Sequence, residues 1–272
     1  MPAAQATTDQ PAPIGPAGVP EQARVWAEGD LADLHAKDDK AQRVEKMFAA
    51  IAGAYDLNNR LHSLGLDQLW RRAAVRAAAL EEGQVAADIA CGTGDLTEML
   101  AKTPARRVIG LDFTNAMLAY AREKRATRPG ALAGKIEYLW ADAHRLPLRD
   151  SSIDALTIAY GIRNVQRPGE ALKEFARVLK PGGRLVILEF DRPANPVVRM
   201  GHEFYTHRVM PLTATLISGD RSGAYRYLPK SVETFLTRDT LVGLIEEAGL
   251  ATVTVRSLTF GVCACYRGVK PA

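Results

Sequence analysis

The stretch that most constrains the fold of this 272-residue chain is VAADIACGTGDLT, at residues 85–97. Small and apolar residues run into Cys91 and two glycines, and a helical pattern follows. Glycine accepts positive φ angles and lets a ligand approach the backbone, so Gly92 and Gly94 predict a turn between a buried strand and a helix. The first N–H groups of such a helix face the turn and form a site that suits nucleotides and carboxylates.

Two ligands fit a turn of this kind. A dinucleotide fingerprint asks for three glycines in the pattern G-x-G-x-x-G, and here Thr97 stands at the third position. This substitution disfavours a site for pyrophosphate. S-adenosylmethionine (SAM) has no phosphate, so its loop needs only close approach to the amino-acid end of the ligand. Because two glycines also occur in plain strand-to-helix connections, the turn alone does not identify the ligand.

The composition fits one large domain. Apolar residues make up 47% of the chain, which provides for an ample core, and the net charge of +4 permits contact with an anionic surface without requiring it. The three cysteines form no C-x-x-C pair and no zinc spacing, as expected in a reducing cytosol. With no export signal and no apolar run of membrane-spanning length, we expect a cytoplasmic protein.

Strand and helix patterns alternate after the glycine turn. Beyond the strand at residues 85–89, short strands are expected at residues 107–112, 135–140, 153–159, 184–190, 251–258 and 261–268. Alternation of this kind implies parallel pairing with right-handed crossovers, and the last two strands are close enough to form a hairpin. The sequence therefore predicts an α/β, Rossmann-like fold: a mostly parallel seven-stranded sheet with helices on both faces and a C-terminal β-hairpin.

The domain plan has four parts. Residues 1–20, rich in Ala, Pro, Gly and Gln, are expected to form a disordered tail. Residues 21–272 are expected to form one domain, which includes a helical cap at about 38–80 and an irregular insert at about 191–230. Within the cap, residues 55–60 have the composition of a polar turn between two helices.

Three acids lie at or next to the carboxyl ends of predicted strands. Ligands of open α/β sheets bind beyond the carboxyl ends of the strands, where Asp88, Asp112 and Asp142 are expected to meet. Asp112 comes 20 residues after Gly92, the spacing of an acid that accepts both ribose hydroxyls. Asp142 with Ala143 suits adenine, because a carboxylate and a backbone N–H match its edge. The alternative for each acid is a helix N-cap.

Longer motifs add a resemblance. DIACGTGDLT, GLDFTNAMLAYAREK, ADAHRLPLRDSSIDALTIAYGIRN and RVLKPGGRLVILEF are similar to motifs of class I SAM-dependent methyltransferases. Together with YDLNNRLHSLGLDQLWRR, YLPKSVETF and LTFGVCACYRGVK, they resemble the ubiquinone/menaquinone biosynthesis C-methyltransferase family over residues 44–270. GIRNV and RVLKPGGRLVILEF discriminate best, whereas unrelated methyltransferases share the glycine turn.

The resemblance implies that Thr93, Asp112 and the pair Asp142–Ala143 contact SAM. Many members have a serine where this chain has Ala159, so a hydroxyl contact to the cofactor is lost there. The expected cofactor-binding residues are Asp88, Gly92, Thr93, Gly94, Asp112, Met117, Asp142, Ala143 and Ala159.

The implied reaction is SAM-dependent C-methylation of a polyprenyl quinol, with S-adenosylhomocysteine (SAH) as the product. Demethylmenaquinol is the favoured substrate; the ubiquinone-pathway benzoquinol, both quinols, or another small molecule are the alternatives. Such a displacement needs alignment and a phenolate but no metal. Arg163 and Asn164 are the expected catalytic pair, because a guanidinium favours the anion of a nearby hydroxyl.

Other site residues are hypotheses. Tyr55 and Asp56 are expected to close over the methyl donor, although Tyr55 equally suits a role in packing the cap. Tyr160, His202 and Tyr205 are expected on the substrate side, and the alternative for a lone histidine is a bystander at the surface. The insert mixes apolar and basic residues, which suits a polyprenyl tail, peripheral contact with the inner face of the membrane, or an ordinary cap.

Two hypotheses about partners stay open, and several classes of function are disfavoured. Homodimerisation and membrane contact are kept as hypotheses, and no nucleic-acid partner is expected. A NAD-binding reductase lacks its third glycine and its Tyr-x-x-x-Lys pair here. An adenine-N6 methyltransferase needs Asn/Asp-Pro-Pro-aromatic after the fourth strand, where this chain has Ala159 and Tyr160. Only the family resemblance argues against a non-catalytic SAM-binding regulator.

Overall fold

The computed structural model describes residues 25–26, 34, 39–127, 130, 132, 134–210, 212–213 and 223–272. The expected disordered tail at residues 1–20 lies outside these ranges. No helix in the described part of the chain is long and apolar enough to cross a membrane.

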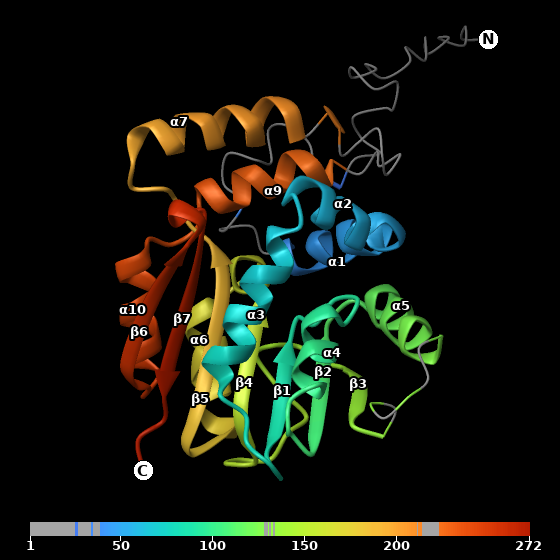
Figure 1. The fold of residues 1–272 in the computed structure, drawn as a ribbon, viewed down its shortest axis with the longest axis vertical. Helices are drawn as coiled ribbons and strands as arrows, with labels where there is room; N and C mark the ends of the chain where they lie inside the picture. Colours follow the sequence, from blue (N-terminus) through green and yellow to red (C-terminus); the bar gives the residue numbers. More distant parts are fainter. Residues whose placement is uncertain are drawn as a thin grey trace, which may run out of the picture.

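A seven-stranded sheet runs through the molecule (Figure 1). Its strands are β1 (Val85–Ile89), β2 (Arg107–Asp112), β3 (Ile136–Trp140), β4 (Ile153–Ala159), β5 (Leu179–Phe190), β6 (Ala251–Leu258) and β7 (Cys263–Val269). The spatial order is β3-β2-β1-β4-β5-β7-β6. β1 to β5 pair in parallel, and β7 is antiparallel to both β5 and β6. The predicted fold, including the C-terminal hairpin, is confirmed.

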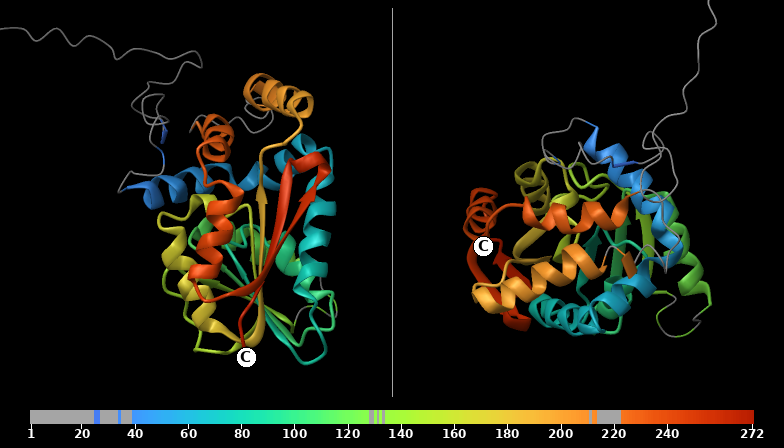
Figure 2. Two further views of the ribbon diagram at one scale, coloured as in Figure 1. Left: turned by 90° about the vertical axis from the view of Figure 1, so that its left-hand side faces the viewer. Right: turned by 90° about the horizontal axis from the view of Figure 1, so that it is seen from above.

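Helices cover both faces of the sheet, because alternate strand residues point to opposite sides (Figure 2). In β1, Ala87 and Ile89 pack into the core beneath α6 (Pro168–Val178) and α10 (Arg238–Glu247). Ala86 packs into the other core, beneath the helices of the opposite face. These helices are α3 (Leu66–Ala78), α4 (Asp95–Ala101) and α5 (Asn115–Ala126).

A helical cap lies over the carboxyl ends of the parallel strands (Figures 1 and 2). It consists of α1 (Lys40–Ile51), a 3-10 turn (Ala52–Ala54), α2 (Tyr55–His62), α7 (Pro196–Phe204), a π-helical turn (Tyr205–Val209) and α9 (Ala224–Glu233). Met47 and Ile51 of α1 and Tyr227 of α9 are buried in a core of the cap's own, where Trp26 stacks on Tyr227 with ring centroids 4.6 Å apart. The cap therefore joins segments from both ends of the chain above the sheet.

Two expectations about the cap are wrong. The expected polar turn at residues 55–60 is the helix α2, whose polar side chains are held by ion pairs with the sheet domain rather than by an apolar face. The insert is not irregular where it is described, because α7 and α9 are regular helices. Asn195 caps α7 by accepting hydrogen bonds from the amides of Val197 and Val198, and Pro196 occupies the first helical turn.

Candidate functional site

A cleft opens at the carboxyl ends of β1 and β4, where the strand order reverses. This switch point is where open α/β sheets bind their ligands. Ala41, Val44 and Phe48 of α1 line the cap side, and Tyr55 follows at the start of α2. The empty space of the cleft, with its open mouth included, is about 1010 Å³.

The cleft gathers most of the expected site residues. Those that line it are Tyr55, Gly92, Asp112, Met117, Asp142, Ala143, Ala159, Tyr160 and Asn164. Among the described residues, its lining does not include Asp56, Asp88, Thr93, Gly94, Arg163, His202 or Tyr205.

The glycine turn has the backbone expected of it. Gly92 and Gly94 have φ angles of +56° and +84°, in the region that side chains rarely adopt. A Cβ built on Gly94 would lie 2.2 Å from the hydroxyl oxygen of Tyr138, whereas one on Gly92 would meet only Tyr55, at 3.9 Å. Gly94 is therefore needed for close packing of the turn, and Gly92 keeps the wall of the cleft open.

Asp112 ends β2 and faces the cleft beside the glycine turn. One carboxylate oxygen accepts a hydrogen bond from the amide of Gly92, and the other accepts one from the amide of Thr114, both at 2.8 Å. Burial raises the pKa of this carboxyl, and the two backbone hydrogen bonds oppose the shift. The contacts fix the orientation of the carboxylate and leave each oxygen with a second acceptor position for a ligand hydroxyl.

Asp142 and Ala143 lie at the other end of this wall. One oxygen of Asp142 accepts from the amide of His144 at 2.9 Å and pairs with its Nδ1 at 2.7 Å. Burial favours a higher pKa of the Asp142 carboxyl, but these contacts with His144 outweigh it and lower the pKa. The side chain is 48% exposed, and Phe113 and Met117 supply apolar walls nearby. The wall thus fits a nucleoside, with one acid for the ribose and one for the base.

Asp88 has a different position from the one expected. Its carboxylate is buried in the sheet and accepts hydrogen bonds from the hydroxyls of Thr97 at 2.6 Å and Thr157 at 2.7 Å. Burial raises its pKa to about 6, against the effect of both hydroxyls. The side chain ties β1 to β4 and α4, so it supports the glycine turn from behind instead of reaching into the cleft.

Arg163 is also placed behind the cleft. Its Nη1 pairs with Glu189 at 2.7 Å and donates to the carbonyl of Tyr160 at 2.6 Å, while its Nε donates to Ser231 Oγ at 3.2 Å. The side chains of Arg163 and Glu189 are only 4% and 2% exposed. These contacts argue against the expected direct contact between the guanidinium and a quinol.

Asn164, in contrast, does line the cleft. Its amide oxygen accepts a hydrogen bond from the hydroxyl of Tyr227 at 2.9 Å, and its amide nitrogen donates to the carbonyl of Tyr160 at 3.3 Å. Lys40, fully buried at the start of α1, donates to the carbonyls of Arg163 and Val165, both at 3.0 Å. Helices α1 and α9 therefore hold the segment at residues 163–165 from the cap side.

Tyr160 has an unusual backbone, with a φ of +58° directly before Gly161. Its carbonyl receives the two hydrogen bonds from Arg163 and Asn164, and its ring packs on Phe190 with centroids 4.8 Å apart. A non-glycine residue in this conformation costs of order 1–3 kcal/mol and is often found at functional sites. Tyr160 itself is one of the residues that line the cleft.

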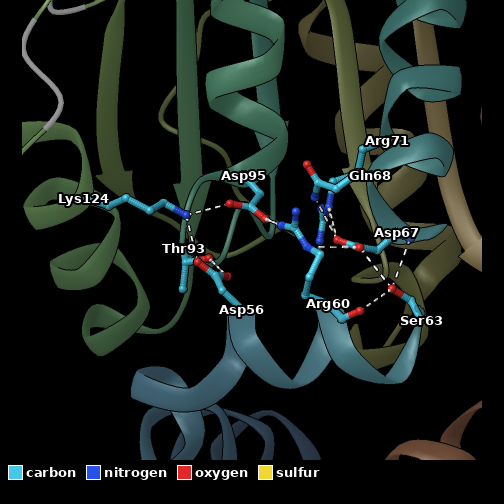
Figure 3. Close-up of polar contacts among 9 residues, drawn as sticks. All are labelled: Asp56, Arg60, Ser63, Asp67, Gln68, Arg71, Thr93, Asp95 and Lys124. Carbon is cyan, nitrogen blue, oxygen red and sulfur yellow. Dashed lines mark hydrogen bonds and ion pairs between the residues drawn. The ribbon is translucent and has the colours of Figure 1, made fainter. Parts of the chain in front are cut away.

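A polar network joins α2 to the glycine turn (Figure 3). Asp56 accepts a hydrogen bond from the Thr93 hydroxyl, and Lys124 of α5 bridges Asp56 at 2.9 Å and Asp95 at 2.7 Å. Arg60 reaches the other oxygen of Asp95 at 3.3 Å. Asp56 and Thr93 thus hold the cap on the glycine turn, and the hydroxyl of Thr93 is engaged within the protein.

His202 and Tyr205 lie in the upper part of the cap. The Tyr205 hydroxyl is 3.1 Å from His62 Nδ1, and burial lowers the pKa of His202. Neither residue meets the cleft in the described part of the chain. Their expected substrate contacts stay a prediction without support from these positions.

Sequence reasoning missed several residues of the site. Phe113 and Thr114 follow Asp112 directly, so their place beside the expected ribose acid was a signal in the sequence. Lys40, Lys124 and Arg71 gave no such signal, because each meets residues that are distant in the chain.

Comparison with known sequences gives one consistent family. The chain matches the model of the ubiE/COQ5 methyltransferase family over residues 36–270. A demethylmenaquinone methyltransferase of Clavibacter sepedonicus is 43% identical over 235 residues, covering 86% of this chain and 92% of the relative. A ubiquinone/menaquinone biosynthesis C-methyltransferase UbiE of Ectopseudomonas mendocina (strain ymp) is 38% identical over 237 residues, covering 86% and 91%.

Solved structures agree on the fold. A SAM-dependent methyltransferase from Aquifex aeolicus superposes with a TM-score of 0.52 at 20% identity, covering 73% of this chain and 88% of that one. Phosphoethanolamine N-methyltransferase 2 of Haemonchus contortus, solved in complex with S-adenosyl-L-methionine, has a TM-score of 0.55 at 14% identity, covering 74% and 52%. At these identities the likeness establishes the architecture alone.

Proposed function

Because this chain belongs to the ubiE/COQ5 methyltransferase family, we propose that it methylates a ring carbon of demethylmenaquinol with SAM as the methyl donor. The chain is a SAM-dependent C-methyltransferase by family. Demethylmenaquinol is favoured because the relative with 43% identity is named for that substrate. The relative named for both quinone pathways keeps the benzoquinol as the second candidate.

The observation that carries the proposal is the wall built from the glycine turn, Asp112 and Asp142. Asp112 is held by two backbone amides in an orientation that lets both oxygens accept from ribose hydroxyls. Asp142 keeps an exposed carboxylate for an exocyclic amine, and the amide of Ala143 follows it. Gly92 leaves space where any side chain would narrow the cleft. When bound, SAM supplies an electrophilic methyl group.

The substrate side is built around Asn164. With its oxygen and one amide proton engaged by Tyr227 and Tyr160, the amide of Asn164 has a second proton for a ring oxygen of the quinol. Arg163 acts as a positioning residue, because it binds the same Tyr160 carbonyl and its charge is balanced by Glu189. The rings of Tyr55, Phe48 and Tyr160 provide flat apolar walls for the quinol. The ring carbon gains the methyl group as the bond between that methyl group and sulfur breaks, SAH is released, and the proton of the ring carbon passes to water.

We also propose that α7 contacts the membrane that holds a polyprenyl substrate. Val197, Met200 and Phe204 recur at helical spacing and are 70%, 68% and 65% exposed. Arg199 and Arg208 are exposed on the same segment, which combines an apolar stripe with positive charge. Helices with this pattern lie in membrane interfaces with the apolar face buried. The helix forms the outer part of the cap, on the side of the molecule where the parallel strands have their carboxyl ends (Figure 1).

The test of the proposed reaction is a comparison of two short-chain quinols under reducing conditions. We expect methylation of demethylmenaquinol with a higher kcat/KM than the benzoquinol, and no methylation of either oxidised quinone, because only the quinol ring is electron-rich. Preference for the benzoquinol would move the assignment to the ubiquinone pathway. Failure to methylate either quinol, with SAM bound, would refute the proposed substrate class.

A further inference from the structure

A buried arginine lies beside the cleft, and one of its N–H donors has no hydrogen-bond partner among the described residues. Arg71 projects from α3, and its side chain is 9% exposed. Its only close acid contact in the described chain is a long ion pair with Asp67, at 3.8 Å from Nε. Among the same residues, Nε has no hydrogen-bond partner. A buried guanidinium normally donates hydrogen bonds from several of its five N–H groups. Because an unpaired buried charge is unfavourable, an anionic ligand would stabilise the protein at this position.

The guanidinium lies at the glycine-turn end of the cleft. Its Cζ is 5.2 Å from the ring centroid of Tyr160, which lines the cleft. Burial raises the pKa of the Tyr55 hydroxyl, and the charge of Arg71 acts against that shift. Tyr55 in turn is the residue that a Cβ on Gly92 would touch. Arg71 is therefore close to two aromatic rings that flank the turn.

Electrostatic balance around Arg71 narrows the class of ligand. Figure 3 draws the acids Asp56, Asp67 and Asp95 with the bases Arg60, Arg71 and Lys124. Three negative and three positive groups cancel, so a ligand with a large net charge is not favoured here. A zwitterionic amino acid brings a carboxylate for the guanidinium and adds no net charge.

We propose that Arg71 binds the carboxylate of the amino-acid part of SAM. This inference rests on the proposed cofactor site and adds its anion-binding residue. Arg71 is a charged donor beside Tyr160, and Asp95, which begins the helix after the glycine turn, is one of the acids whose charge acts on it. A guanidinium suits a carboxylate because its planar fork can make two parallel hydrogen bonds. The long contact with Asp67 keeps the side chain oriented without occupying it fully.

The experiment compares two ligands by isothermal titration calorimetry. SAH carries the amino-acid carboxylate, whereas decarboxylated SAH keeps the amine and lacks that group. We expect Arg71→Met to weaken SAH binding about tenfold or more, the scale of a lost charged hydrogen bond. Binding of decarboxylated SAH should change by less than about twofold on the same scale. Arg71→Lys should recover part of the loss for SAH.

The matched control is Arg72→Met, because Arg72 is the neighbouring arginine and is exposed. It should leave both affinities unchanged. If Arg71→Met does not fold, Arg71→Gln allows the same comparison of the two affinities, with a polar side chain in the buried position.

Three results would overturn the inference. Equal weakening of both ligands would show that Arg71 only shapes the cleft, and unchanged SAH binding would show that it touches no cofactor. Lower kcat with an unchanged ratio of affinities would place it on the quinol. If the wild-type protein binds neither ligand, the proposed cofactor site fails as well; wild-type binding with an insensitive Arg71 refutes this inference alone.

Discussion

The buried pair of Arg163 and Glu189 provides the sharpest test of how the cleft is built. The two charges are 2.7 Å apart and almost fully buried. Burial raises the pKa of the Glu189 carboxyl, and the Arg163 charge acts against that shift. Removing one partner leaves the other as an uncompensated buried charge, which costs about 3–5 kcal/mol. We therefore expect Arg163→Met and Glu189→Gln each to destabilise the protein by about this amount.

The double variant should be less destabilised than the sum of the two single variants, because it buries no unpaired charge. Denaturation by urea, followed by circular dichroism, measures all three free energies of unfolding. Turnover should fall in both single variants with little change in SAM affinity, since both disturb the Tyr160 carbonyl that positions Asn164. If Arg163→Met keeps full stability, Glu189→Gln keeps full turnover, and only the arginine variant loses activity, the guanidinium acts on the quinol directly.

Three further predictions concern the cofactor, the cap and α7. Asp112→Asn should weaken SAM binding by about 2–3 kcal/mol in calorimetry, and Asp142→Asn by less, because the amide of Ala143 remains; unchanged affinity in a folded Asp112 variant contradicts the ribose assignment. Burial and the nearby Arg163 charge lower the pKa of Lys40 to about 8, so the folded state releases this proton at a lower pH than the unfolded chain does. The stability of the wild type relative to Lys40→Met should then rise by about 2 kcal/mol between pH 7.5 and 9.5, and a flat difference in urea denaturation refutes the shift. Met200→Glu should reduce sedimentation with vesicles that contain anionic lipid, whereas Ala251→Glu, at the opposite edge of the sheet, should not; equal binding of both variants argues against α7 as the contact.

The fold could be predicted because each strand and helix carries its own periodicity. The run at residues 85–97 fixed the strand, turn and helix in order, and the parallel strands followed from the alternation. Asp112 and Asp142 were predictable for the same reason, since parallel strands end at one edge of a sheet. The helix α2 was not predictable in this way. Its polar residues are held by Lys124 and Asp95, which are distant in the sequence.

The local sequence pattern also could not predict the directions in which buried charged side chains point. Arg163 follows the strand end that faces the cleft, and its position alone suggested contact with the substrate. Its partner Glu189 lies 26 residues further along the chain and ends a neighbouring strand, so the ion pair exists only after β4 and β5 pair. Arg71 and Asp88 follow the same logic, because their neighbours come from several elements of the folded chain.

The most direct test of the central claim is the position of the transferred methyl group. The wild-type protein is incubated with short-chain demethylmenaquinol and SAM labelled with ¹³C in its methyl group, and the product is examined by NMR. We expect the label as a methyl group on a ring carbon, with one equivalent of SAH formed and with both lost in the Asp112→Asn variant at limiting SAM. A label on a ring oxygen, or SAH formed without any labelled quinone, would contradict C-methylation in this cleft.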